Sequence, residues 1–254
     1  VKCNICEMIY ENPRLPKDVI LKGYISTDQS LHDSQYKNRV SSFYKALVNI
    51  QDHLPLKGAK VLDIGPAGGA FLEAAQMFGY DAYGLEPSKY LTEEAQKRGL
   101  KVKQGTIDEN PYIEASFDMV CLWDVIEHLV EPKKDLLKIK AFLKPNGILL
   151  INYPDIGTTM AKIAGKRFWW IISVHLHHFS RTTIKKICDL TGFNVFYFRT
   201  YWQTLELNYL FDMAIRYKIP TASFFKKILP SFLRKIKIKY YASQTTALAR
   251  LKNA

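Results

Sequence analysis

Apolar and polar positions follow a helical spacing early in the chain and then change to short, strand-like runs. Between residues 29 and 54 the apolar positions recur at roughly every third or fourth residue, and Pro55 and Gly58 end this segment. From residue 60 onward, short apolar runs alternate with amphipathic stretches that end at glycines. Strands that alternate with helices in this way are typical of a doubly wound α/β sheet.

Seven strands and four helices are predicted from residue 60 onward. The run at 147–153 is apolar throughout, as expected of a strand covered on both faces. The predicted strands are 60–64, 81–85, 100–104, 117–122, 147–153, 193–201 and 245–251. The predicted helices are 69–78, 88–98, the segment from Pro132 to before Pro145, and 181–191 after the N-cap Ser180. Residues 1–20 are expected to form turns and short extended pieces, because Pro13 and Pro16 disfavour a helix.

Composition excludes several classes of protein. With 254 residues, 48% of them hydrophobic and 24% charged, the chain fits one globular domain and is too apolar for disorder. No apolar run approaches the roughly 18 residues of a membrane-spanning helix, and the first residues show no secretory signal. Four cysteines do not make a disulfide scaffold, so a reducing cytoplasm is the expected compartment. The absence of an initial methionine suggests a fragment or a processed product.

The net charge of +12 is concentrated in one segment. Eight basic residues and no acidic residue lie between Met213 and Tyr240, with apolar side chains at helical spacing between them. Such a basic amphipathic segment is suited to an anionic membrane surface, and equally to a packed lid with a solvated cationic face. Nucleic acid is not expected as a partner, because no RNA- or DNA-binding module is recognisable.

A glycine-rich turn follows the first predicted strand, at the edge where open α/β sheets bind ligands. Its spacing differs from Gly-x-Gly-x-x-Gly, and Asp63 precedes the first glycine, where a carboxylate would repel a pyrophosphate. Glu86 follows the second strand and is placed to accept both hydroxyls of a ribose. A ligand with a ribose and a positive charge points to S-adenosylmethionine.

At these residues the sequence resembles the class I S-adenosylmethionine-dependent methyltransferases. It is most similar to the small-molecule branch with the ubiquinone-biosynthesis O-methyltransferases and the sugar C-methyltransferases. The resemblance implies a Rossmann-like sheet whose last strand is antiparallel, a helical N-terminal lid and a basic helical insertion. The motifs that carry it are Asp63-Ile64-Gly65-Pro66-Ala67-Gly68-Gly69, Gly84-Leu85-Glu86-Pro87-Ser88, Trp123-Asp124-Val125-Ile126-Glu127-His128-Leu129, Leu143-Lys144-Pro145-Asn146-Gly147 and His175-Leu176-His177-His178-Phe179-Ser180.

The family implies roles for individual residues around S-adenosylmethionine. Asp63 and the glycines would line its methionine end, Glu86 would hold the ribose, and Trp123 would lie near the acceptor. The residues expected to bind the cofactor are Asp63, Gly65, Gly68, Gly69, Phe71, Glu86, Thr106, Ile107 and Trp123, with Thr106 and Ile107 flanking the adenine.

A base assists methyl transfer when the acceptor is a hydroxyl or a carbon acid. Asp124, Glu127 and His128 are candidates after the fourth strand. Similar ubiquinone-pathway enzymes use a Glu-x-x-Glu-His array for a divalent metal, whereas other relatives share the Glu-His pair without metal. The histidines at 175–178 either shape the entry to the next helix or face the acceptor. We expect His128 or His177 to be the catalytic base.

Cys3 and Cys6 form half of a four-cysteine zinc site. Cys121 and Cys188 lie in a predicted strand and a predicted helix, so they are not expected to complete it. Sugar methyltransferases and their relatives often carry a second such pair upstream. The resemblance therefore implies a zinc knuckle in the intact protein, with two ligands missing from this chain.

The sequence predicts an enzyme that methylates a small molecule, with S-adenosylmethionine as cofactor. The expected acceptor is a sugar, a phenol or quinone precursor, or a lipid-linked glycan, modified by O-methylation. The alternatives are C- or N-methylation of a sugar and a non-catalytic adaptor that docks on a membrane. A cytoplasmic location is expected, and peripheral contact of the basic segment with an anionic membrane is one of its two alternatives. The predicted parts are a partial zinc-knuckle-like segment at 1–20, a helical lid at 21–58, a methyltransferase core at 59–202, a basic helical insertion at 203–240 and a final core strand at 241–254.

Overall fold

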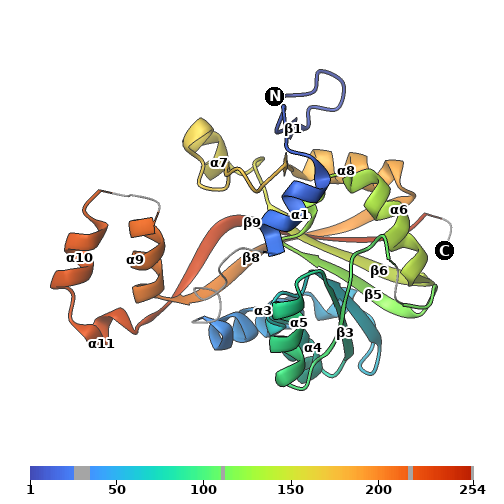
Figure 1. Ribbon diagram of the computed structural model, residues 1–254, viewed down its shortest axis with the longest axis horizontal. Helices are drawn as coiled ribbons and strands as arrows, with labels where there is room; N and C mark the ends of the chain where they lie inside the picture. The colour runs from blue at the N-terminus through green and yellow to red at the C-terminus, as the bar shows by residue number, and fades with distance from the viewer. Residues whose placement is uncertain (26–34, 110–111, 217–219, 253–254) are drawn as a thin grey trace.

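A twisted sheet of seven strands forms the centre of the protein, as a computed structural model shows for residues 1–25, 35–109, 112–216 and 220–252 (Figure 1). The strands are β2 (Lys60–Ile64), β3 (Asp81–Glu86), β4 (Lys101–Gln104), β5 (Phe117–Trp123), β6 (Leu143–Pro154), β8 (Phe193–Glu206) and β9 (Lys237–Leu251). Their order is β4-β3-β2-β5-β6-β9-β8, and β9 runs antiparallel to both of its neighbours. The predicted Rossmann-like sheet with an antiparallel last strand is confirmed.

The strand order reverses direction between β2 and β5, which are parallel neighbours. From β2 the chain moves outward to β3 and β4, and then returns to build β5 and β6 on the other side. The connections that leave β2 and β5 therefore cross the sheet on opposite faces. A crevice opens between them at the carboxyl ends of these two strands. This edge is where the residues expected to bind the cofactor converge.

Helices cover both faces of the sheet. The helices are α3 (Tyr36–Ile50), α4 (Ala70–Phe78) and α5 (Lys89–Lys97) on one face, and α6 (Pro132–Phe142) and α8 (Arg181–Leu190) on the other. Successive strand residues point to opposite faces, so Val61 packs with the first layer and Leu62 with the second. The helix ends follow the sequence signals: Ser180 forms a capping box with Thr183, and Gly79 ends α4 with a φ of 104°.

The N-terminal segment is more ordered than the sequence predicts. β1 (Ile9–Tyr10) pairs with β7 (His177–His178), and α1 (Lys17–Ile25) begins directly after Pro16. The expectation of turns and short extended pieces is wrong for residues 17–20, which belong to α1. A proline is well suited to the start of a helix, where no backbone N–H is required. Of the helix expected from residue 29 to 54, α3 covers the central part, and residues 29–34 lie outside the described residues.

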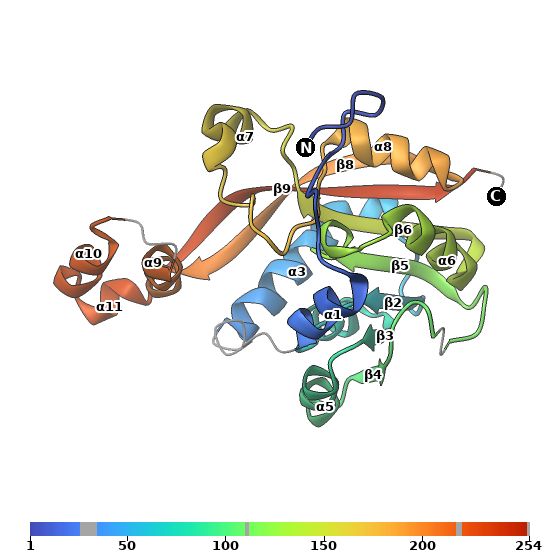
Figure 2. The same ribbon diagram turned by 45° about the horizontal axis from the view of Figure 1, so that its top comes forward.

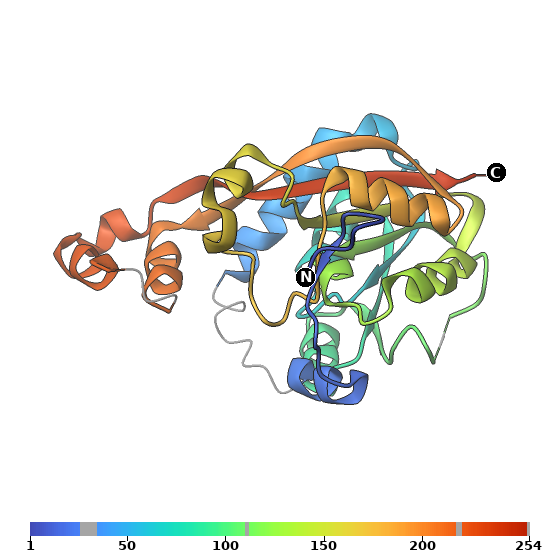
Figure 3. The ribbon, with the colours of Figure 1, turned by 90° about the horizontal axis from the view of Figure 1, so that it is seen from above.

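The last two strands extend beyond the sheet and carry a helical arm, defined here as residues 207–236. β8 and β9 stay paired to Glu206 and Lys237, further than predicted, and the arm holds α9 (Leu207–Arg216), α10 (Ala222–Ile228) and α11 (Ser231–Arg234). Figures 2 and 3 show the arm at the opposite end of the molecule from the C-terminus. Because β8 is parallel to β6, the arm leaves from the carboxyl edge of the sheet. Among the described residues, no helix is long and apolar enough to cross a membrane.

Candidate functional site

The glycine turn between β2 and α4 needs its glycines for geometric reasons. Gly65 and Gly69 have φ values of 69° and 89°, in the left-handed region that glycine adopts without strain. A Cβ at Gly65 would lie 3.0 Å from Val125 Cγ2, so a side chain there would push into the segment after β5. The turn therefore brings the backbone close to the crevice and begins α4 there.

Glu86 is held at the end of β3 by backbone donors. Its Oε1 accepts the N–H of Ser88 at 2.9 Å, and its Oε2 accepts the N–H of Ala67 at 3.0 Å. The Tyr24 hydroxyl of α1 donates to Oε2 at 3.4 Å. Burial raises the pKa of Glu86 to about 7, although these donors favour the charged form. The glycine turn and Glu86 are thus joined through Ala67.

Asp63 is buried near Glu86 and lacks a full set of partners. Its Oδ1 has no hydrogen-bond partner among the described residues, although the side chain is buried. Burial raises the pKa of Asp63 well above its usual value, and the charge of Glu86 adds to this effect. A buried acceptor without a donor is costly, and a cationic group of a ligand would remove that cost. The two carboxylates fit a ligand with a positive charge and a ribose.

The remaining residues expected at the cofactor come from β5 and from the segments that follow β2 and β4. Gly105 donates its N–H to the Glu86 carbonyl at 3.0 Å, which fixes the start of the segment that carries Thr106 and buried Ile107. Phe71 and Trp123 are buried, and their ring centroids lie 5.2 Å apart. They belong to an aromatic cluster with Phe43 and Tyr201. Gly68 follows in the same turn, and its carbonyl accepts a hydrogen bond from Arg98 at 3.2 Å.

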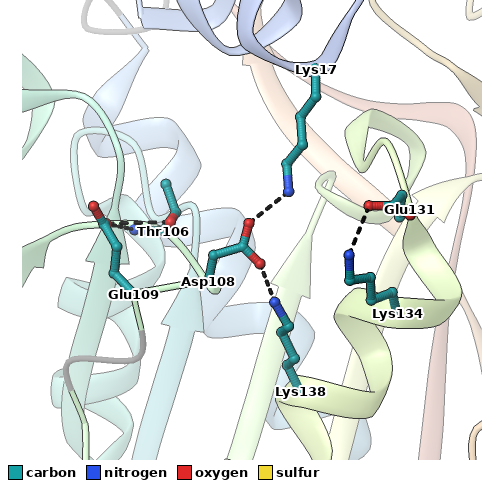
Figure 4. A network of polar contacts seen from close by, with 7 residues as sticks. All are labelled: Lys17, Thr106, Asp108, Glu109, Glu131, Lys134 and Lys138. Atoms are coloured by element: carbon teal, nitrogen blue, oxygen red, sulfur yellow. Dashed lines mark hydrogen bonds and ion pairs between the residues drawn. The ribbon is translucent and has the colours of Figure 1, made fainter.

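Helix α1 crosses the same edge and is tied to the segment after β4 (Figure 4). Lys17 contacts Asp108 Oδ2 at 2.7 Å, and Lys138 of α6 binds the other oxygen. The hydrogen bonds from Lys138 and Lys17 lower the pKa of Asp108 to about 2. This carboxylate therefore remains charged at every physiological pH and links α1 to α6.

Asp124 lies at the end of β5 in an unusual conformation. Its φ is 56°, and its Oδ1 accepts hydrogen bonds from Asn152 Nδ2 at 2.8 Å and Gln244 Nε2 at 2.6 Å. Burial raises the pKa of Asp124 to about 6. Sequence reasoning found Asp124 but missed its amide partners, because Gln244 comes from β9, far along the chain. The charge of Asp124 also helps to raise the pKa of Glu127, after the larger effect of burial.

Glu127, His128 and His175 form a cluster of three groups whose donor atoms lie within 4.8 Å of one another. Neither carboxylate oxygen of Glu127 has a hydrogen-bond partner among the described residues. His128 Nδ1 lies 2.7 Å from the Val174 carbonyl, and His175 Nδ1 lies 2.9 Å from the Trp170 carbonyl. These carbonyls accept the Nδ1 protons, which leaves both Nε2 atoms free to accept or to ligate.

His177 is not part of this cluster and lies in β7, which pairs with the N-terminal segment. It pairs with Tyr10 in the short sheet, its side chain is buried, and its Nδ1 has no partner among the described residues. Burial lowers the pKa of His177 to about 4, and that of His175 to about 3. Both imidazoles are therefore neutral at pH 7. The two histidines expected as bases, His128 and His177, thus stand in different surroundings.

A comparison with models of protein families shows which family the chain belongs to. Residues 33–197 match the family model described as "Methyltransferase domain", which is more than half of the chain. The chain belongs to this methyltransferase family. The match contains the glycine turn, Glu86 and the segment from Trp123 to Leu129, so the resemblance seen in these motifs is confirmed.

Curated relatives of this methyltransferase domain include ubiquinone biosynthesis O-methyltransferases. The one from Azorhizobium caulinodans is 32% identical over 104 residues, which are 39% of this chain and 41% of the relative. The mitochondrial one from Dictyostelium discoideum is 28% identical over 149 residues, which are 51% of this chain and 46% of the relative. The chain thus spans less than half the length of these curated relatives.

Solved structures support the fold of the methyltransferase domain. A SAM-dependent methyltransferase from Thermotoga maritima matches with a TM-score of 0.58 and 20% identity, over 91% of this chain and 98% of that one. Phosphoethanolamine N-methyltransferase 2 from Haemonchus contortus, in complex with S-adenosyl-L-methionine, matches with a TM-score of 0.56 and 18% identity, over 92% of this chain and 60% of that one. At these identities the likeness concerns the fold alone.

The two cysteines expected to bind zinc precede the family match. Cys3 and Cys6 lie in the N-terminal turn, where Cys3 N donates to the Met8 carbonyl at 2.8 Å. Both thiols are free, and backbone N–H groups, chiefly that of Cys6, lower the pKa of Cys3. Within the described part of the chain, neither cysteine belongs to a cluster of three or more metal-ligating side chains.

Proposed function

We propose that this methyltransferase domain transfers a methyl group from S-adenosylmethionine to a small-molecule acceptor. One observation carries the proposal: the orphaned oxygen of Asp63 lies beside Glu86 at the carboxyl edge, next to a turn with obligatory glycines. S-adenosylmethionine supplies a methyl group on a positively charged sulfur. Asp63 offers a carboxylate to the charged methionine end, Glu86 accepts from the ribose hydroxyls, and Thr106 and Ile107 flank the adenine.

The proposed chemistry is O-methylation, with the acceptor being a sugar, a phenol or quinone precursor, or a lipid-linked glycan. A hydroxyl acceptor loses its proton as the new bond forms, so a base near the acceptor assists the transfer. His128 is the first candidate, because its Nδ1 is held by a carbonyl and its Nε2 is free to accept a proton. His177 is the second, since it is neutral at pH 7. Methylation at nitrogen or carbon remains the alternative reaction.

The acceptor class is tested by incubating the purified chain with methyl-labelled cofactor and separate panels of sugars, phenols and lipid-linked glycans. Transfer of label to a hydroxyl oxygen of one class, located by NMR of the product, is the expected result. His128→Gln should lower kcat by at least roughly a hundredfold if His128 is the base. Cofactor binding without label transfer to any acceptor would instead favour the non-catalytic adaptor.

Glu127, His128 and His175 support a second proposal, a divalent-cation site. Two neutral imidazoles and one carboxylate are a donor set that first-row divalent metals accept, and both imidazoles have the backbone partner typical of ligating histidines. A cation there would satisfy the orphaned oxygens of Glu127 and could polarise an acceptor oxygen. A ligating His128 could not also be the base, so the two roles exclude each other.

Thermal unfolding with and without added Mn²⁺ or Co²⁺ tests the cation site independently of activity. A rise in Tm that grows with metal concentration is expected for the native chain, and Glu127→Gln or His175→Gln should abolish it. The single variant Glu93→Gln, at an exposed position, serves as the matched control. An identical response in the native chain and in both cluster variants would contradict the site and return His128 to the role of base.

Zinc at Cys3 and Cys6 stays a proposal, and it requires two further ligands besides these cysteines. Two thiolates alone leave half of a tetrahedral site without ligands. A chain extended upstream should retain zinc through purification and lose it in the double variant Cys3→Ser, Cys6→Ser. Absence of zinc from the extended chain would contradict the knuckle. Peripheral contact with an anionic membrane is also proposed.

A further inference from the structure

The arm presents large apolar side chains to solvent. Phe224, Ile228 and Phe232 are 59%, 58% and 71% exposed, and Phe225 and Ile236 are about half exposed as well. Residues four apart share a helix face, so Phe224 and Ile228 point the same way from α10. Soluble proteins seldom expose so many large apolar side chains in one short segment unless the surface has a partner.

Positive charge surrounds these apolar side chains. Lys226 is paired with Asp212 of α9, whereas Lys227, Arg234 and Lys235 take part in no ion pair within the part of the chain that the structure describes. The arm therefore combines an apolar surface with a strong excess of unneutralised positive charge. A partner must supply apolar contact and negative charge together.

Aromatic residues lie at the base of the arm. Trp202 is exposed on β8, its ring lies 5.2 Å from that of Tyr241, and Lys239 Nζ lies 4.9 Å from its centroid. Tryptophan and tyrosine are favoured where an apolar layer meets polar headgroups. Trp202 and Tyr241 thus give the arm aromatic side chains at its base, which suit the headgroup layer of a membrane when the apolar side chains of the arm enter the bilayer.

We propose that the arm docks on the surface of a bilayer that contains anionic phospholipids. Its apolar side chains enter the interfacial layer, and its lysines and arginines contact phosphate groups. A second copy of this chain is a poorer partner, because two arms that meet would bring like charges together. The arm projects from one end of the molecule, which leaves it accessible to a flat surface (Figures 1 and 3). This proposal does not depend on methyl transfer.

Vesicle flotation with the purified chain tests the proposal. We expect binding to phosphatidylcholine vesicles that contain phosphatidylglycerol, little binding to phosphatidylcholine alone, and release at high salt. The variant Lys227→Gln, Lys235→Gln should weaken the partition coefficient by about 25-fold, at roughly fivefold for each charge. The variant Phe224→Ser, Phe232→Ser should weaken it at least tenfold. Both pairs are exposed, so circular dichroism and Tm should stay unchanged.

The matched control variants are Lys133→Gln and Leu56→Ser, at exposed positions outside the arm and distant from it in sequence. They should bind vesicles as the native chain does. No binding of the folded native chain to anionic vesicles would overturn the proposal. So would equal binding to neutral vesicles, or equal losses in the controls. A concentration-dependent dimer that the Phe224→Ser, Phe232→Ser variant abolishes, without vesicle binding, would assign the arm to self-association.

Discussion

Asp63 and Glu86 lie in the same crevice but differ in their hydrogen-bond partners. Glu86 accepts two backbone N–H groups and the Tyr24 hydroxyl, so its position is set by the fold. Asp63 Oδ1 has no donor among the described residues. Glu86 is therefore suited to orient a neutral polyol such as a ribose, and Asp63 to pair with a positive charge.

Cofactor affinity should depend on pH through Glu86. Burial raises its pKa to about 7, so the carboxylate that accepts from the ribose becomes protonated as the pH falls through 7. The ionised fraction falls about tenfold between pH 8 and pH 6, and the Kd for S-adenosylmethionine should rise by about the same factor. Calorimetry at both values measures this change. Glu86→Gln should bind weakly and with a smaller pH dependence, because Asp63 is then the only one of the two carboxyls that titrates, and an equal pH dependence in that variant would refute the assignment.

Helix α1 covers the cofactor edge in this structure. Tyr24 occupies an oxygen of Glu86 that a ribose hydroxyl would need, while Lys17 ties the start of the helix to Asp108 (Figure 4). The cofactor and Tyr24 therefore compete for Glu86. None of the residues of α1 is fully buried, so the helix is able to shift when a ribose hydroxyl replaces the Tyr24 hydroxyl at Glu86.

Removing the Tyr24 hydroxyl should strengthen cofactor binding. Tyr24→Phe frees Glu86 Oε2, and a hydrogen bond to a charged group contributes about 1.5 kcal/mol, so Kd should fall by up to roughly tenfold. Calorimetry of Tyr24→Phe and of the exposed control Tyr90→Phe measures the effect. Weaker binding by Tyr24→Phe alone would contradict competition and show that the hydroxyl contacts the bound cofactor.

Elements set by local signals were predictable from the sequence, whereas long-range pairings were not. The strand and helix ends around the glycine turn follow from glycines, caps and apolar runs within a few residues. The helix after Pro16 was missed because the proline was interpreted as a stop and not as a start. The meeting of His128 with His175, and of Asp124 with Gln244, depends on the register of strands and loops distant in sequence. No local sequence pattern specifies how these distant strands and loops align.

The whole molecule combines a sheet with a ligand edge and an arm that leaves from the same edge. β8 runs parallel to β6, so the arm and the crevice lie on the carboxyl side of the sheet. A docked arm would bring this edge toward the membrane. Such an arrangement favours an acceptor that is itself held in the bilayer, among the small molecules proposed above.

The arm should be dispensable for folding and for cofactor binding. Glu206 and Lys237 are the last paired residues of β8 and β9, so replacing residues 207–236 by Asn-Gly would close them with a two-residue hairpin turn. We expect Tm within a few degrees of the native value and an unchanged Kd for S-adenosylmethionine, with vesicle binding lost. A shortened chain that fails to fold, or that binds the cofactor much more weakly, would show that the arm belongs to the core.

Titration calorimetry of the purified chain with S-adenosylmethionine and S-adenosylhomocysteine tests the central claim most directly. We expect micromolar binding of both ligands. Glu86→Ala and Asp63→Ala should each weaken binding by roughly tenfold or more, as expected when a hydrogen bond to a charged group is lost. The exposed control Glu114→Ala should bind as the native chain does. A folded native chain that binds neither ligand would contradict the assignment of this edge as a cofactor site.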